Sequence, residues 1–216
     1  MININTLDYW NSRFGSGDWE NKGGFSQTRA FAESQVPLFG INQDFDGTLC
    51  DFGCGAGDAF PVYRDAFPNA KLIGIDFSQS AIDLCIEKYG KIAEFICGDY
   101  TKMPKSDIVI ASNVFEHLSN DKEIASHIKK KCNTFYIIVP FQEKIILGNE
   151  HINSYDLDSF NFLGCRETKV FLSRGWSSFG LSYYYNICLK NIIRIFIGKK
   201  LARQRKQIMY IIKNNA

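Results

Sequence analysis

Residues 49–60 read LCDFGCGAGDAF and place three glycines at every second position directly behind an apolar run. The run holds one acidic residue, Asp51, and the glycines are Gly53, Gly55 and Gly57. Glycine suits positions where φ is positive or where a ligand must approach the main chain closely. The stretch is therefore either a plain tight turn or the edge of a ligand site.

The composition is that of one α/β domain. The chain has 216 residues, of which 45% are hydrophobic and 22% are charged, with a formal net charge of +2. This near balance excludes a strong global attraction to nucleic acid, although a local basic patch stays open.

The cysteines and the N-terminus suggest a cytoplasmic protein. The seven cysteines form no CxxC pair, and several lie in apolar runs where a free thiol acts as a small hydrophobe. The N-terminus lacks the basic and apolar regions of a signal peptide, and no apolar run reaches the roughly 20 residues that cross a bilayer. No cluster of zinc ligands is visible in the sequence, so we expect no metal site.

Short apolar runs alternate with amphipathic segments from residue 48 onward. The predicted strands are 48–52, 71–75, 93–97, 108–112, 134–139, 167–172 and 207–212. The predicted helices between them are 59–66, 79–88 and 121–130, the second with Ser78 as its N-cap. Regular alternation of strand and helix predicts an α/β fold with a doubly wound, mostly parallel sheet.

The position of the glycine turn favours the ligand site. Ligands of open parallel sheets bind beyond the carboxyl ends of the strands, where this turn lies. Asp76 ends the second predicted strand about 20 residues past the turn, the place from which a carboxylate binds ribose hydroxyls. Dinucleotide sites favour G-x-G-x-x-G, whereas the order here is G-x-G-x-G. The sequence therefore predicts a nucleoside-bearing cofactor that is not a dinucleotide.

Four stretches together resemble the class I S-adenosylmethionine-dependent methyltransferases: DFGCGAGD, GIDFS, CGDY and SNVFEHL, in the family's order and spacing between residues 48 and 118. The resemblance implies a Rossmann-like sheet of seven strands, mostly parallel, with an antiparallel C-terminal hairpin. It implies S-adenosylmethionine as the cofactor and a single methyltransferase domain. The implied parts are a cofactor-covering extension (1–42), a cofactor-binding half (43–140), and a substrate-side half (141–216) with a helical insertion at about 177–204.

The resemblance also implies roles for single residues. Asp51 approaches the cofactor's ammonium or else ties the N–H groups of the turn. Asp76 binds the ribose or else is a charge at the N-terminus of the next helix, with the ribose role favoured. Asp99 accepts from the adenine amino group or else closes an ordinary turn. Arg13 pairs with the methionine carboxylate if the aromatic N-terminal segment folds over the cofactor rather than covering the core. The implied cofactor-binding residues are Tyr9, Arg13, Asp51, Gly53, Gly55, Gly57, Asp76, Phe77, Asp99, Tyr100 and Asn113.

Methyl transfer from a sulfonium needs alignment and a dry pocket, and a hydroxyl acceptor also benefits from a general base. His117 follows the fourth predicted strand and His151 lies in the loop after the fifth, whereas His127 lies in a lysine-rich helix and is expected to be solvated. We predict His117 or His151 as the base, with His117 favoured. Glu116 either orients His117 or faces the cofactor through its backbone. Local capping for His117 and a plain loop surface for His151 are the alternatives.

The residues directly after the fourth predicted strand narrow the acceptor class. The sequence there is SNVF rather than the N/D-P-P-Y/F box of enzymes that methylate base amino groups, and no RNA-binding appendage is visible. We expect a small metabolite or glycan methylated at oxygen, as in a surface-polysaccharide pathway. An RNA methyltransferase and a non-catalytic cofactor-binding partner protein are the alternatives.

The segment at 183–206 combines many apolar residues with a basic end at 199–206. It predicts a helix packed under the sheet edge, a dimer or substrate lid, or a helix lying on an anionic membrane. Packing or a lid is favoured, and peripheral membrane contact stays open. The sequence predicts no oligomeric state.

Overall fold

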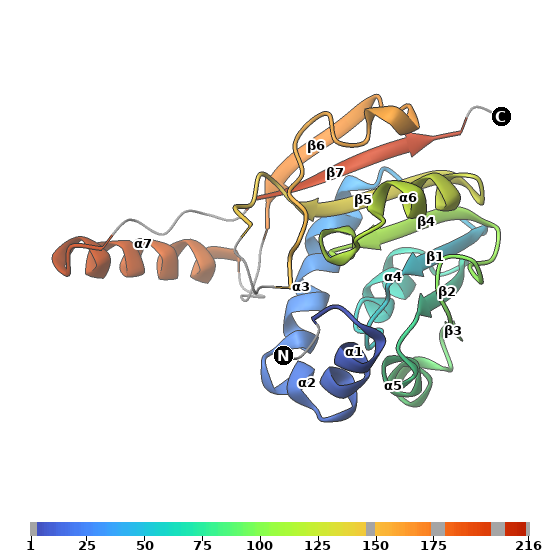
Figure 1. Cartoon of the computed structure of the whole chain (residues 1–216), viewed down its shortest axis with the longest axis horizontal. Helices are drawn as coiled ribbons and strands as arrows, with labels where there is room; N and C mark the ends of the chain where they lie inside the picture. The colour runs from blue at the N-terminus through green and yellow to red at the C-terminus, as the bar shows by residue number, and fades with distance from the viewer. Residues whose placement is uncertain (1–3, 146–149, 174–179, 200–205, 215–216) are drawn as a thin grey trace.

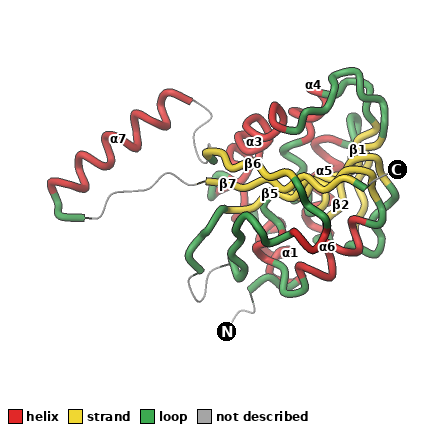
Figure 2. Tube along the Cα trace, turned by 90° about the horizontal axis from the view of Figure 1, so that it is seen from above, coloured by secondary structure: helices red, strands yellow, loops and turns green. Residues whose placement is uncertain are grey.

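The structure, a computed structural model, describes residues 4–145, 150–173, 180–199 and 206–214, with the side chains of α7 described from residue 188. Helices lie on both faces of a seven-stranded sheet with strand order β3-β2-β1-β4-β5-β7-β6 (Figures 1 and 2). The strands are β1 (Thr48–Phe52), β2 (Lys71–Asp76), β3 (Glu94–Cys97), β4 (Ser106–Ser112), β5 (Cys132–Pro140), β6 (Glu167–Leu172) and β7 (Lys206–Lys213). The helices are α1 (Leu7–Gly15), α2 (Asp18–Asn21), α3 (Gly24–Gln35), α4 (Phe60–Ala66), α5 (Gln79–Tyr89), α6 (Asp121–Lys129) and α7 (Gly180–Phe196), with short 3₁₀ turns η1 (Val36–Leu38), η2 (Phe115–His117) and η3 (Asn161–Leu163).

The pairing of the strands confirms the expected fold class. β1 lies between β2 and β4, and all pairs from β3 through β5 are parallel. β7 runs antiparallel to both β5 and β6. The sheet is therefore doubly wound and mostly parallel, with an antiparallel C-terminal pair, and every predicted strand is present within two residues of its expected ends.

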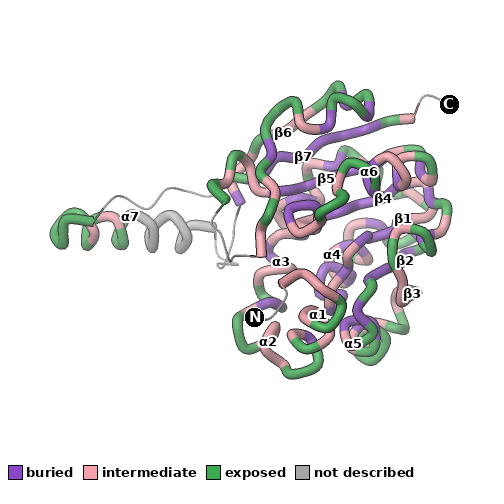
Figure 3. Tube along the Cα trace, in the orientation of Figure 1, coloured by how far each residue is buried: buried purple, intermediate pink, exposed green. Residues whose placement is uncertain are grey.

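The central strands are buried on both faces because helices cover each side. Along β5, Phe135 and Ile137 face the layer formed by α6 and η2, while Tyr136 and Ile138 face the layer formed by α3, α4 and α5. Figure 3 shows the buried strands between half-exposed helices. Parallel strands buried on both faces read as continuous apolar runs rather than alternating ones, which explains why these strands could be predicted.

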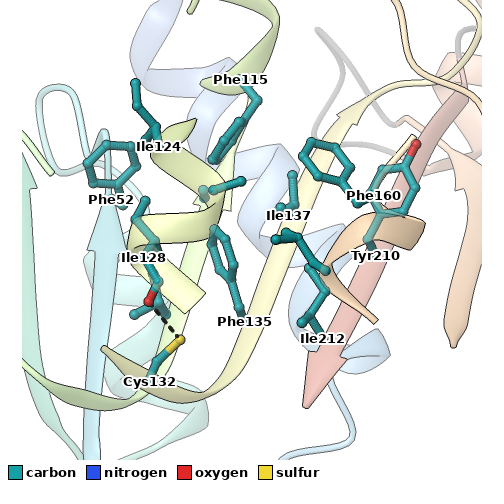
Figure 4. Close-up of a cluster of buried hydrophobic side chains, with 14 of the residues drawn as sticks. Phe52, Phe115, Ile124, Ile128, Cys132, Phe135, Ile137, Phe160, Tyr210 and Ile212 are labelled. Atoms are coloured by element: carbon teal, nitrogen blue, oxygen red, sulfur yellow. Dashed lines mark hydrogen bonds between the residues drawn. The ribbon is translucent and has the colours of Figure 1, made fainter. Parts of the chain in front are cut away.

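Aromatic side chains fill the α6 side of the core. Figure 4 shows Phe115 and Phe135 beside Ile124 and Ile128 of α6, with Phe160 close to the strand β7. Phe115, Phe135 and Phe160 are fully buried, and the ring centroids of Phe115 and Phe160 lie 5.7 Å apart. This packing holds η2, and hence the residues beside Phe115, against the end of the sheet.

Helix α7, which follows β6 and precedes β7 in the chain, projects away from the sheet (Figures 1 and 3). Its apolar side chains Leu189, Ile192 and Phe196 are exposed, Phe196 by 84%. The expectation of a helix packed under the sheet edge is therefore wrong for the described part of α7, while the lid and the membrane helix stay predictions. The rest of the expected insertion, at 177–179 and 200–204, lies outside the described residues. Among the described residues, no helix is both long and apolar enough to cross a bilayer.

Candidate active site

A cavity of about 860 Å³ opens at the carboxyl ends of β1, β2, β4 and β5. Its wall is formed by the glycine turn, the ends of β2 and β3, the loops after β4 and β5, and the helices α1 and α3. All of the predicted site residues except Tyr9 and Gly57 line it. The topology therefore brings the predicted cofactor and catalytic residues to one cavity.

The glycines of the turn have different surroundings. A Cβ on Gly53 would lie 2.4 Å from Val114, and one on Gly57 would lie 2.9 Å from Cys85 of α5, so both positions are close packing contacts. Gly55 has φ of +53°, and a Cβ there would approach only Phe14, at 3.4 Å. Gly55 is therefore the glycine whose main chain is open to the cavity, whereas Gly57 packs against α5 and does not support the predicted cofactor contact.

The two acidic residues beside the turn, Asp51 and Asp76, differ in their hydrogen bonds. The Asp76 carboxylate accepts hydrogen bonds from the backbone N–H of Gly55 (3.0 Å) and of Ser78 (2.9 Å), while burial raises its pKa. Burial and the neighbouring carboxylate of Asp76 raise the pKa of Asp51 to about 8. Among the hydrogen bonds of the described residues, none joins the Asp51 side chain to an N–H of the turn. This supports the cofactor role over the turn-tying role for Asp51.

The predicted adenine side of the cavity is more open. Phe77 is 37% exposed, although it lines the cavity. The Asp99 carboxylate accepts hydrogen bonds from the backbone N–H (2.9 Å) and hydroxyl (2.6 Å) of Thr101, which lower its pKa. Tyr100 also lines the cavity and packs edge-on against His127, with ring centroids 5.1 Å apart. His127 is thus half-buried, with Nε2 enclosed, rather than solvated as expected.

Helix α1 is tied to the loop after β5 through Glu150. The Glu150 carboxylate accepts hydrogen bonds from the Tyr9 hydroxyl and from Nη1 of Arg13. Arg13 also lies between the rings of Trp10 and Trp19, about 5.5 Å from each centroid. Tyr9 therefore lies behind the cavity wall, where it binds Glu150 and does not line the cavity. The Arg13 guanidinium is paired with Glu150 through Nη1, and the buried Nε of Arg13 has no hydrogen-bond partner.

Glu116, His117 and His151 form what we call the acid–imidazole cluster. One nitrogen of each histidine and one carboxylate oxygen of Glu116 lie within 4.8 Å of one another. The backbone carbonyl of Glu116 accepts hydrogen bonds from the N–H groups of Ile152 (2.8 Å) and Asn153 (3.2 Å). These two bonds dock the loop after β5 on η2, which is why residues more than thirty positions apart meet.

Burial controls the charges in the cluster. Burial, followed by the nearby charges of His151 and Arg13, lowers the pKa of His117 to about 3. Burial raises the pKa of Glu116 to about 8, and both of its carboxylate oxygens are enclosed without a hydrogen-bond partner. His151 lies nearer the surface, with Nδ1 2.5 Å from the Glu143 carboxylate. The cluster therefore combines two imidazoles with a buried carboxyl group on the wall of the cavity.

Sequence reasoning missed a closed ring of side-chain hydrogen bonds on the same wall, which we call the amide ring. Gln35 donates to Gln207 (3.3 Å), Gln207 to Asn113 (2.8 Å), Asn113 to Ser112 (3.1 Å), and Ser112 back to Gln35 (3.0 Å). The members come from α3, β7 and the end of β4, so no spacing in the sequence signals the ring. Asn113, predicted to bind the cofactor, has φ of +57° and its side chain belongs to this ring.

Residues 49–133, which hold the glycine turn and the acid–imidazole cluster's η2 turn, match the family model described as "Methyltransferase domain". This stretch of the chain is therefore similar to a methyltransferase domain, in line with the resemblance of its four sequence motifs. In sequence, no curated protein matches the chain.

Solved methyltransferases share the fold. The plantazolicin methyltransferase BpumL in complex with SAH is 20% identical, with a TM-score of 0.60 over 98% of this chain and 96% of that one. Coclaurine N-methyltransferase bound to N-methylheliamine and SAH is 10% identical, with a TM-score of 0.63 over 87% of this chain and 72% of that one. A SAM-dependent methyltransferase from Aquifex aeolicus is 16% identical, with a TM-score of 0.52 over 85% of this chain and 92% of that one.

The lining of the cavity fits S-adenosylmethionine, the cofactor that the sequence motifs imply. The open main chain at Gly55 permits close approach, the Asp76 carboxylate is aimed by two backbone N–H groups, and each of its oxygens retains acceptor capacity for a ribose hydroxyl. Asp51 supplies a buried carboxyl group for a cationic ligand, and Phe77 supplies an apolar face. The donors and acceptors present therefore match a cationic nucleoside.

Proposed function

We propose that this methyltransferase transfers a methyl group to a hydroxyl oxygen of a small polar acceptor. The observation that carries the proposal is the acid–imidazole cluster, which lines the same cavity as Gly55 and Asp76. A hydroxyl must lose its proton when it is methylated, and imidazole is the usual group for that transfer near neutral pH.

The amide ring supports a neutral, hydroxyl-rich acceptor such as a sugar or a precursor of a surface polysaccharide. The half-buried amide of Asn113 uses one N–H and one carbonyl lone pair within the ring and keeps one of each for a ligand, whereas Gln35 and Gln207 are almost fully buried and hold it in place. Hydroxyl groups both donate and accept hydrogen bonds and can therefore pair with such a surface. A charged acceptor would gain less from these uncharged groups.

When bound, S-adenosylmethionine supplies a methyl group on a sulfonium, which an acceptor oxygen takes in line while the C–S bond breaks and its electron pair stays on sulfur. The acceptor O–H bond breaks, and the proton passes to the imidazole of His151 or to that of His117, which burial makes a weak base by lowering its pKa to about 3. Trp10 packs edge-on against His117, with centroids 5.4 Å apart, and holds that ring in place. Helices α1 and α3 wall one side of the cavity and so limit the access of water to the reacting groups.

The test uses methyl-labelled S-adenosylmethionine with a panel of sugars, other hydroxyl compounds and amines, and identifies the methylated atom. We expect transfer to oxygen. His117→Ala and His151→Ala should each lower kcat by roughly 10²- to 10⁴-fold. The affinity for S-adenosylhomocysteine should hardly change, because neither imidazole belongs to the predicted cofactor contacts.

His127→Ala is the matched control, since His127 lies on α6 away from the cluster, and it should keep full turnover. Transfer to amines alone, or full turnover in both cluster variants, would contradict the proposal. Amines belong in the panel because one structural neighbour is an N-methyltransferase.

A further inference from the structure

The acid–imidazole cluster has the spacing of a cation site. Its three ligand-type atoms, from Glu116, His117 and His151, lie within 4.8 Å of one another. Bonds of about 2.0–2.2 Å to a transition cation place neighbouring ligand atoms roughly 3 to 4 Å apart, so small side-chain rotations suffice.

Both histidines are oriented as metal ligands usually are. Nδ1 of His117 donates to the backbone carbonyl of Glu150 (3.1 Å), and Nδ1 of His151 lies 2.5 Å from the carboxylate of Glu143. A metal-ligating histidine typically gives one ring nitrogen to a carbonyl or carboxylate and the other to the ion. The contact of His117 leaves its Nε2 for a cation, and each histidine places one ring nitrogen in the cluster.

Glu116 provides an independent indication of a positive ligand. Its side chain is only 1% exposed, and neither carboxylate oxygen has a hydrogen-bond partner, although the residue lines the cavity. A buried carboxyl group without a hydrogen-bond partner is costly to ionise, and a bound cation offsets that cost.

We propose that Glu116, His117 and His151 bind one divalent transition cation of the Zn²⁺, Co²⁺ or Mn²⁺ class at the acceptor end of the cavity. Two imidazoles and one carboxylate suit such ions better than Mg²⁺ or Ca²⁺, which prefer all-oxygen ligand sets. Three protein ligands leave a coordination position open toward the cavity.

This inference rests on the proposed function and deepens it. A cation there would supply Lewis acidity that lowers the pKa of an acceptor hydroxyl. With the cation bound, the two imidazoles would be its ligands, and the hydroxyl proton would pass to water or buffer at the cavity mouth instead of to them. The acceptor class is then a hydroxyl compound that can reach both the cation and the methyl donor.

The test is a titration of chelator-treated full-length protein with Co²⁺. We expect one Co²⁺ per chain, with visible absorption of a nitrogen- and oxygen-ligated ion and no thiolate charge-transfer band. Zn²⁺ should displace it. Glu116→Gln and His151→Gln should each weaken binding by at least tenfold, and Glu143→Gln by roughly 10- to 100-fold.

His127→Gln is the control and should bind Co²⁺ as the unaltered protein does, and circular dichroism checks that each variant is folded. Failure of the folded protein to bind Co²⁺, or binding that the cluster variants leave unchanged, would overturn the inference. If the protein does not bind Co²⁺ and still transfers methyl groups in excess chelator, the cation site is rejected and the proposed function stands. Cluster-dependent Co²⁺ binding supports the cation site even if no hydroxyl acceptor is methylated, in which case the proposed function alone fails.

Discussion

The glycines of the cofactor turn differ in what a side chain would meet, and this difference can be tested at Gly55. Its φ of +53° and open surroundings place its main chain on the cavity wall. Gly55→Val should abolish binding of S-adenosylhomocysteine in calorimetry, because the branched side chain would occupy cofactor space.

Gly40→Val is the matched control for that experiment. Gly40 has φ of +68°, with nothing within 4 Å of its Cβ position, and it does not line the cavity. Both variants should lose about 1–2 kcal/mol of folding stability from backbone strain, but Gly40→Val should keep the cofactor affinity. Equal affinities in the two variants would contradict the assignment of Gly55.

Asp51 predicts a pH dependence of cofactor binding. Burial, together with Asp76, raises its pKa to about 8 in the free protein, so the carboxyl group is mostly protonated at neutral pH. A cationic ligand binds the ionised form better, so binding should release a proton, and the Kd should fall as the pH rises from 6 to about 8 and then level off.

Calorimetry in buffers of different ionisation enthalpy measures this proton release, and Asp51→Asn should remove both the release and the Asp51-dependent part of the pH profile. A wild-type Kd that stays constant from pH 6 to 9 would show that Asp51 does not face the cofactor. An Asn variant that keeps the full pH dependence would show the same.

At the scale of elements, the strands could be predicted and the docking of the loops could not. β1 and β6 have the predicted bounds because apolar runs there are ended by turn residues. The loop after β5 reaches η2 through backbone hydrogen bonds from Ile152 and Asn153 to Glu116, and backbone bonds leave no residue pattern. The three members of the acid–imidazole cluster were predicted, but their spacing and the isolation of Glu116 depend on that docking.

The packing of helix α7 could not be predicted either, because an amphipathic pattern does not indicate which surface the apolar side contacts. In the structure, its described apolar side chains face away from the core and Phe196 is 84% exposed. Phe196→Ser should therefore change the free energy of unfolding by about 0.5 kcal/mol or less.

Phe115→Ala provides the contrast, since Phe115 is fully buried in the core, and it should cost about 3–5 kcal/mol. Urea unfolding measures both changes. A comparable loss in the Phe196 variant would mean that α7 packs against the body of the protein.

At the scale of the whole molecule, the strand order explains why one cavity holds both halves of the site. β1 lies between β2 and β4, so the chain crosses to the opposite side of β1 between β3 and β4, and a crevice forms beyond the strand ends at that switch. Asp76 at the end of β2 was predictable for this reason. The amide ring was not, because α3 and β7 approach β4 only in the folded molecule.

The most direct test of the central claim is calorimetric titration of the protein with S-adenosylmethionine, S-adenosylhomocysteine and NAD. We predict that the first two bind at one site per chain and that NAD does not bind. Asp76→Asn should raise the Kd by roughly 5- to 150-fold, equivalent to about 1–3 kcal/mol for a hydrogen-bonded charged group. Tight binding of NAD without binding of S-adenosylmethionine, or an unchanged Kd in the folded Asp76→Asn variant, would contradict the account.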